Sequence, residues 1–235
     1  MFSFLKKLIV STMVVTLTII GIIMPSEVFA DSQDDENFIS QEEFNELKAN
    51  GVYGEEITYE DLINSINLYQ NEDYTLVPTK RSAYQPKKGD IVTTGYKTTA
   101  SSGVIGHAGI FIDSSTILHI SGSSTSKTST LSWGRWKEIY KNKNMVFRVP
   151  NTRVATQAAD WVARNYRGKS PGYKITSDWR STSPTYCSKI VWQGYYFGTG
   201  STPVMKKPVE PFIIQPRTIA QYFNQSYAPA LVFSN

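Results

Sequence analysis

The chain has 235 residues, a formal net charge of +4 and 40% hydrophobic residues, with one cysteine and two histidines. This composition is typical of a globular protein that buries a core, and a single cysteine excludes an internal disulfide. The cysteine and histidines show no close Cys-x-x-Cys or His-x-x-x-His spacing. We therefore expect no metal site and no other cofactor.

The first thirty residues have the features of a signal peptide. Lys6 and Lys7 supply the positive start, an apolar stretch runs from Leu8 to Met24, and the small residue Ala30 precedes a strongly polar segment. We expect cleavage after Ala30 and a secreted or cell-surface protein. Because the apolar stretch is long for a signal peptide, an uncleaved anchor remains the alternative. No later segment is long and apolar enough to span a bilayer.

Residues 31–80 form an acidic preface, with thirteen acidic side chains against Lys48 and Lys80. Its apolar spacing predicts a helix from Ser40 to Ala49 and a second helix that begins after Thr58. The rest, 81–235, carries twenty Lys and Arg against six acidic residues. This asymmetry has three interpretations: two solvated surfaces, a basic body that meets an anionic surface, or an acidic segment that folds back over that body.

Residues 81–235 are expected to form the main α+β domain, an antiparallel sheet packed against helices. A linker over 77–88 leads into a first strand, and a hairpin follows with its turn at 113–115. Residues 121–129 are expected to be a loop without strong structure, and the tail to end in a strand. Beyond these, the pattern predicts a strand at 145–149, a helix at 152–166, a long loop at 168–185, a helix opening at Cys187, and a short helix at 216–223.

Cys187 opens an amphipathic run, where unpaired backbone N–H groups lower the pKa of a thiol and can receive an oxyanion. His107 and His119 lie on the two strands of the hairpin, six positions on either side of Asp113. Their side chains can therefore share one face and form an imidazole–imidazole hydrogen bond. The alternative is structural: a small buried cysteine and two core histidines. All three together favour a cysteine hydrolase.

Three short motifs carry a family resemblance: Gly89-Asp-Ile-Val, Gly106-His-Ala-Gly-Ile and Tyr186-Cys-Ser-Lys-Ile-Val-Trp. In this order they resemble the circularly permuted papain-like amidases, the YiiX/YaeF-like branch of the NlpC-type cysteine hydrolases. The order His, His, Cys also resembles the lecithin:retinol acyltransferase relatives, which share the permuted fold. The resemblance covers roughly residues 84–225 and leaves the acidic preface unexplained.

The resemblance implies that Cys187 is the nucleophile, His107 the base and His119 the third polar member of the site. An acidic residue commonly follows the Cys-Ser pair in this family, and Lys189 stands there instead. Asp90 is expected to cap the turn into its strand.

Three aromatic residues are weaker candidates for the site. Tyr186 is a candidate donor to the oxyanion or a packing residue. Tyr173 and Trp179, in the loop before the cysteine, are candidates for a substrate groove or for packing of that loop.

These features predict an exported cysteine hydrolase that cleaves an amide-like bond in cell-envelope material through a thioester acyl-enzyme. One alternative is a lipid-directed acyltransferase or thioesterase of the same fold, and another is a non-catalytic cell-wall-binding module. The expected partners are a peptidoglycan peptide or an acylated amine or lipid, and an anionic polymer or membrane surface. No nucleic acid is expected to bind, and the protein is expected to be a monomer.

Overall fold

The computed structural model describes residues 39–67, 84–95, 105–122, 126–141, 144–207 and 213–235. The predicted signal peptide, most of the predicted linker and the polar segment 96–104 lie outside these residues. Residues 37–235 form one compact unit. None of the helices in the described ranges has the length and apolar character needed to cross a membrane.

A six-stranded antiparallel sheet lies at the centre of this unit, with strand order β4-β3-β2-β1-β5-β6. It is packed against helices, which confirms the expected α+β class. The strands are β1 (Ile91–Thr94), β2 (His107–Phe111), β3 (Thr116–Ile120), β4 (Thr128–Ser132), β5 (Met145–Arg148) and β6 (Ala230–Ser234).

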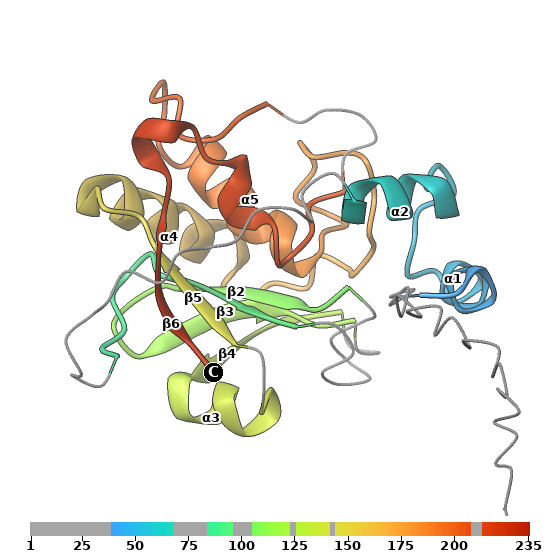
Figure 1. Ribbon diagram of the computed structural model, residues 1–235, viewed down its shortest axis with the longest axis horizontal. Coiled ribbons are helices and arrows are strands. Elements are labelled where there is room, and N and C mark those ends of the chain that lie inside the picture. The colour runs from blue at the N-terminus through green and yellow to red at the C-terminus, as the bar shows by residue number, and fades with distance from the viewer. Residues whose placement is uncertain (1–38, 68–83, 96–104, 123–125, 142–143, 208–212) are drawn as a thin grey trace, which may run out of the picture. The chain divides into compact units, whose positions relative to one another are not determined.

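Helices lie on both faces of the sheet (Figure 1). α4 (Thr152–Tyr166) and α5 (Cys187–Phe197) lie over one face, and α3 (Trp133–Ile139) lies over the other. Two short 3₁₀ helices, Ile219–Tyr222 and Gln225–Tyr227, precede the last strand. The helix expected at 216–223 is therefore only a single tight turn.

Side chains of β2 alternate between the two faces, as a strand requires. Ala108 and Ile110 belong to the apolar cluster that contains α5, whereas Phe111 packs with Trp136 of α3. Gly109 lies between these positions, and a side chain there would collide with Ile117 and with the Trp136 ring. His107, two residues before Gly109, therefore lies on the α3 face.

The hairpin of β2 and β3 is confirmed, but its register differs from the expected one. Asp113 accepts hydrogen bonds from the backbone N–H groups of Ser115 and Thr116, at 2.8 Å each. Ile110 pairs with Leu118, which centres the pairing on residue 114, one residue after Asp113, from which the two histidines are equidistant. The two histidines are consequently diagonal neighbours on one face and are not directly opposite each other.

The expectation of an unstructured loop through Ser129 is wrong at its end. β4 begins at Thr128 and pairs with β3 along its whole length. Four of its five side chains are exposed or half-buried, so the strand lacks the apolar alternation that marks a strand in sequence. Ser132 ends β4 and caps α3, because its hydroxyl accepts a hydrogen bond from the Arg135 N–H.

The acidic preface contains the two expected helices, α1 (Gln41–Ala49) and α2 (Tyr59–Asn67). Ser40 caps α1 through the Glu43 N–H, and Thr58 and Asp61 bond each other's backbone N–H at the start of α2. The segment between them folds onto the main body, since Tyr53 forms a parallel bridge with Ile175. The contacts therefore favour the fold-back interpretation for the described part of the preface.

Asp90 fixes the entry to β1, as expected for a turn cap. Its carboxylate accepts hydrogen bonds from the Lys87 N–H at 2.8 Å and from the Tyr84 hydroxyl at 2.6 Å. Arg148 of β5 forms a bidentate ion pair with Asp90, with its Nε at 2.7 Å from Oδ1 and its Nη2 at 2.5 Å from Oδ2. Asp90 is 1% exposed, so its charge is fully paired inside the fold.

Candidate functional site

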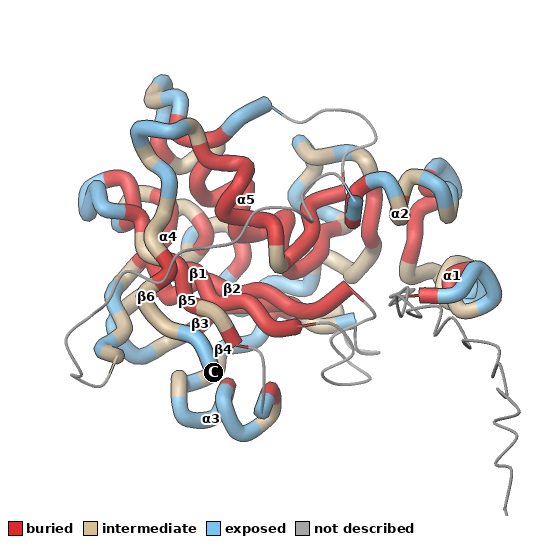
Figure 2. The backbone as a smooth tube through the Cα atoms, in the orientation of Figure 1, coloured by how far each residue is buried: buried red, intermediate tan, exposed pale blue. Residues whose placement is uncertain are grey.

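Cys187 is the first residue of α5, as predicted from the sequence. Its side chain is 1% exposed, and nearly every residue of the helix around it is buried (Figure 2). The expected fall in the thiol pKa is wrong. Burial raises the pKa of the Cys187 thiol above its usual value, and the backbone N–H groups of Ala108 and Ser188 oppose this only in part.

His107 is the first residue of β2 and is almost fully buried. Its ring lies parallel to those of Trp136 and Tyr140, at centroid distances of 5.3 and 5.2 Å. Its backbone N–H donates to the Thr94 hydroxyl at 3.1 Å. Ring stacking and the strand backbone therefore hold the imidazole in one orientation.

A chain of polar atoms runs from His107 to the edge strand. His107 Nε2 lies 2.9 Å from His119 Nδ1, which confirms the predicted imidazole pair. His119 Nε2 lies 2.9 Å from the hydroxyl of Ser129 on β4. These contacts use both nitrogens of His119 and Nε2 of His107. Nδ1 of His107 is therefore the one ring nitrogen of the pair that takes no part in this series of polar contacts.

Both imidazoles are neutral at neutral pH. Burial lowers the pKa of His119 to about 4. Burial, and then repulsion from a charged His119, lower the pKa of His107 well below its ordinary value. A neutral imidazole retains a lone pair that can accept a proton. The site therefore combines a protonated thiol with two uncharged imidazoles, in place of a thiolate–imidazolium pair.

The thiol and the imidazoles meet at the start of β2 but approach from opposite faces of the sheet. The sulfur contacts the N–H of Ala108, the residue directly after His107, and Cys187 is close enough to help raise the pKa of Tyr140, which stacks on His107. Among the contacts of the described residues, no hydrogen bond joins the sulfur to either ring. The three predicted groups therefore gather at one point without forming a closed triad.

Tyr173 is the predicted aromatic that reaches the thiol. Its hydroxyl is close enough to the Cys187 sulfur for the thiol to help raise the phenol pKa, although burial is the main cause of that rise. Neighbouring pairing holds this part of the loop in place: the N–H of Lys174 donates to Thr185, and the N–H of Ile175 donates to Val52 of the preface. Tyr173 and its loop thus cover the sulfur.

The other two aromatics lie elsewhere. Tyr186 is fully buried, and its hydroxyl accepts a hydrogen bond from the Ile214 N–H at 3.1 Å, in keeping with the packing alternative. Trp179 packs on Trp192 and Tyr196 along α5. Neither makes a described hydrogen bond to the thiol.

Lys189, the departure from the family pattern, is buried beside the nucleophile. Its Nζ donates to the Pro184 carbonyl at 3.2 Å and lies 5.9 Å from the centre of the Tyr186 ring. Burial lowers the pKa of Lys189 to about 8, although Asp178 and Glu56 act in the opposite direction. The lysine therefore anchors the loop before Cys187 to α5.

Ser129, Trp136 and Tyr140 are members of the site that sequence reasoning missed. Trp136 and Tyr140 are one helical turn apart, so their rings can cover one spot. Ser129 is the register partner of His119 across β3 and β4. Prediction of a strand at 128–132 would have placed Ser129 beside His119. The segment is polar and exposed, however, so its sequence does not predict a strand.

No group of three His, Cys, Asp or Glu side chains that could hold a metal ion occurs among the described residues. The absence of a metal site in the whole protein therefore stays a prediction from the sequence.

One solved structure similar to this chain is that of the metalloprotein YiiX from Escherichia coli O157:H7. It shares 19% identity, covers 64% of this chain and 90% of its own, and aligns with a TM-score of 0.37. A Bacillus thuringiensis protein described as an uncharacterized 30.3 kDa protein is 31% identical over 163 residues. That match includes 62% of this chain and 56% of the relative, so the chain spans about half the length of this relative.

The model of one protein family matches residues 56–234, which include the last part of the preface, all six strands and every site residue described above. By this match, the chain belongs to the family of LnsA-like lipoprotein N-acylation proteins.

Proposed function

We propose that this protein is a cysteine acyltransferase that forms a thioester on Cys187 and passes the acyl group to an amine. The main support is the polar chain from Ser129 through His119 to His107, because the backbone N–H of the next residue, Ala108, interacts with the Cys187 sulfur. The family's description, lipoprotein N-acylation, names a reaction of this class. We assign the fold to the permuted papain-like type from the order His107, His119, Cys187.

In the first half-reaction, the thiol attacks an ester carbonyl of a lipid donor. When Ser129 accepts from His119 Nε2–H, and His119 Nδ1 accepts from His107 Nε2–H, Nδ1 of His107 is the nitrogen left to act as base. Transfer of the thiol proton to it requires the sulfur and the imidazole to come into contact when the donor binds. The N–H of Ser188 and the Tyr173 hydroxyl, both of which interact with the sulfur, are the proposed donors to the developing oxyanion. Collapse of the adduct breaks the ester C–O bond, and the imidazolium returns its proton to the departing alcohol.

In the second half-reaction, an amine attacks the thioester and gives up a proton to His107. The C–S bond breaks, the amide is released, and the sulfur recovers a proton. Cell-envelope amide hydrolysis, the function expected from sequence, uses the same nucleophile and base with an amide donor and water as acceptor. The two functions therefore differ in donor and acceptor and share the thioester.

We also propose that the protein acts outside the cytoplasm, with residues 1–30 as its export signal, and that 31–80 and 81–235 are its preface and catalytic parts. Export would bring the enzyme to lipid and lipoprotein substrates of the cell envelope. The basic balance of 81–235 supports contact with anionic envelope material.

The test is to trap the acyl-enzyme. The protein is incubated with vesicles of an ester phospholipid, and intact mass spectrometry is expected to show one added fatty-acyl group. Peptide mapping is expected to place that group on Cys187, the only cysteine. Addition of a lipopeptide with a free amino terminus is expected to remove the adduct and yield the N-acylated lipopeptide.

Cys187→Ala should form no adduct and no amide, and His107→Gln should form the adduct at least a hundredfold more slowly. Thr130→Ala, an exposed change on β4, is the matched control and should behave as the unaltered protein. Amide formation by Cys187→Ala at the full rate would refute the mechanism. Release of amines from cell-wall peptides, without any adduct from lipid, would favour the hydrolase. An unreactive thiol together with tight polymer binding would favour a non-catalytic module.

A further inference from the structure

Four aromatic rings form a half-buried patch at the end of α5 remote from Cys187. This aromatic patch consists of Trp161 on α4, Trp179 in the preceding loop, and Tyr196 and Phe197 on α5. Their ring centres are 5.3 to 6.1 Å apart along the series Trp161–Phe197, Phe197–Trp179 and Trp179–Tyr196. The rings therefore pack on one another as a continuous surface that is still partly exposed.

Basic side chains lie beside this patch. The Arg180 guanidinium lies 3.9 Å from the centre of the Trp179 ring. Arg164 is exposed and one helical turn from Trp161 on α4. Residues 153–207 contain nine Lys and Arg and only two acidic residues, Asp160 and Asp178.

The two acids offset the basic residues near the patch only in part. Asp160 is paired with Lys88 at 2.6 Å. An Asp178 carboxylate oxygen accepts hydrogen bonds from the backbone N–H groups of Arg180 and Ser181, at 3.0 and 3.2 Å. The surface is consequently both aromatic and positively charged.

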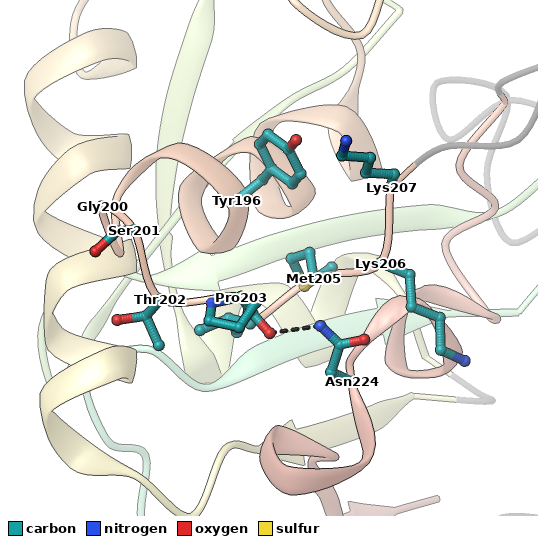
Figure 3. Close-up of a pocket in the computed structure, with 10 residues that line it drawn as sticks. Tyr196, Gly200, Ser201, Thr202, Pro203, Met205, Lys206, Lys207 and Asn224 are labelled. Carbon is teal, nitrogen blue, oxygen red and sulfur yellow. Dashed lines mark hydrogen bonds between the residues drawn. The ribbon is translucent and has the colours of Figure 1, made fainter.

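A cavity of about 470 Å³ adjoins the patch at Tyr196 (Figure 3). Its apolar lining includes Pro203, Val204 and Met205, and two lysines, Lys206 and Lys207, line it as well. Both lysines are exposed, and the Lys206 Nζ donates to the Gln221 carbonyl at 2.8 Å. An apolar wall beside ammonium groups suits a molecule with a negative head and a hydrocarbon part.

We propose that the aromatic patch and the basic residues Arg164, Arg180, Lys206 and Lys207 dock the protein on a bilayer of anionic phospholipid. Trp and Tyr rings with one buried and one exposed side are typical of the boundary between lipid and water. Lys and Arg near an anionic leaflet add electrostatic attraction. A polyanionic polymer could bind to the basic side chains alone, and its binding would not require the half-buried aromatic rings.

Docking at this surface brings the nucleophile's helix close to the lipid. Trp192, which packs beneath Trp179 and Tyr196, is five residues after Cys187, or about 7.5 Å along the helix axis. The inference goes beyond the proposed function, because binding to lipid is measurable without acyl transfer.

The test uses the chain from Asp31 with Cys187→Ala, because the apolar stretch 8–24 would bind lipid by itself. This chain contains the whole compact unit 37–235. Sedimentation with vesicles of phosphatidylglycerol and phosphatidylcholine is expected to show binding that falls at high salt. Pure phosphatidylcholine vesicles should bind at least tenfold more weakly.

The variant Arg180→Glu with Lys207→Glu changes two exposed side chains and should lose at least tenfold in affinity for the anionic vesicles. Its matched control is Lys137→Glu with Trp133→Ser on α3. There, Lys137 lies 5.3 Å from the centre of the half-buried Trp133 ring, on the other face of the sheet. The control should bind as the parent chain does, with both variants checked for an unchanged melting temperature.

Insertion is measured separately. Phospholipid with brominated acyl chains should quench tryptophan fluorescence, and Trp179→Phe should reduce that quenching. Equal binding of the Arg180→Glu/Lys207→Glu variant, or an equal loss in the α3 control, would overturn the proposal. So would binding to soluble polyphosphate as tight as to vesicles, without quenching by brominated lipid. Failure to trap an acyl-enzyme would refute the proposed function and leave this result intact.

Discussion

His107 is held by contacts on three sides: two stacked rings, the Thr94 hydroxyl at its backbone and His119 at Nε2. Because the ring is already held in one orientation, it loses little conformational entropy when it accepts a proton at Nδ1. Its environment, however, disfavours a charge, because burial lowers its pKa. The imidazole is therefore suited to accept a proton briefly during attack and unsuited to rest as a cation.

Ser129→Ala tests the outer end of the polar chain. Loss of the hydroxyl leaves His119 Nε2 without this partner and should slow acyl-enzyme formation about tenfold, the effect of roughly one hydrogen bond. The measurement is the single-turnover rate of adduct formation, with Thr130→Ala as the neighbouring control. Ser129→Thr, which restores a hydroxyl, should recover most of the rate. An unaltered rate in Ser129→Ala would remove Ser129 from the proposed mechanism.

The reactivity of the thiol towards iodoacetamide tests its protonation state. Because burial raises the pKa of Cys187, the fraction of thiolate is small at neutral pH and grows as the pH rises beyond the ordinary value. The alkylation rate at Cys187, followed by mass spectrometry, should increase continuously from about pH 6 to about pH 9. A plateau that begins below neutral pH would show a stabilised thiolate and contradict this expectation.

At this scale the sequence revealed the identities of the reacting groups but not their charges. Cys187 at a helix start and the His107–His119 pair followed from local spacing alone. The rise in the thiol pKa comes from burial of Cys187, which depends on parts of the chain distant from α5 in the sequence. Local helix geometry therefore predicted the wrong direction.

Among the elements, the loop at 168–185 and the preface act together over the nucleophile. Tyr173 reaches the sulfur, and two residues later Ile175 pairs with the preface. The Gly54 N–H donates to the Ile175 carbonyl, and the Ile175 N–H donates to the Val52 carbonyl, both at 2.8 Å. The preface thus fastens the segment that covers Cys187.

Gly54→Pro removes one of these donors and should loosen the loop. The expected result is alkylation of Cys187 several-fold faster than in the unaltered chain, read from the mass shift at neutral pH. Gly54→Ala retains the N–H and is the control for an added side chain, whose methyl group must displace the Glu56 carboxylate and with it the hydrogen bond that this carboxylate accepts from the Ser177 N–H. Equal alkylation rates in the proline and alanine variants would show that this pairing does not limit access.

Elements with an apolar pattern were predicted well, and those without one were missed. The helices at 41–49, 59–67 and 152–166 have caps and apolar spacing that can be read locally. β4 is an exposed edge strand, and α3 has seven residues of which only Trp136 is buried. Their positions are set by pairing with β3 and by the Trp136 contact, which the local sequence does not encode.

For the molecule as a whole, the buried histidines link stability to pH. In the unfolded chain a histidine takes up a proton near pH 6.5, whereas in the folded chain His119 does so only near pH 4. Between these values the unfolded state binds more protons, so the free energy of unfolding falls as the pH falls. His119 alone should account for a loss of roughly 3 kcal/mol across that interval.

Urea unfolding at a series of pH values measures this loss. The variant His119→Gln, which cannot take up a proton, should show a flatter dependence than the unaltered chain. The same slope in both chains would assign the acid sensitivity to other groups.

α5 is fastened to its surroundings by polar side chains that point into the interior. Ser188 donates to the Ile214 carbonyl, Lys189 to Pro184, and Gln193 to Trp179 and Ser181. These tethers run to connecting segments and leave the strand ladder untouched. Loss of one of these hydrogen bonds would expose one side of α5 and leave the pairing of the strands intact. Amide hydrogen exchange should therefore begin in the connecting segments before it reaches the strands.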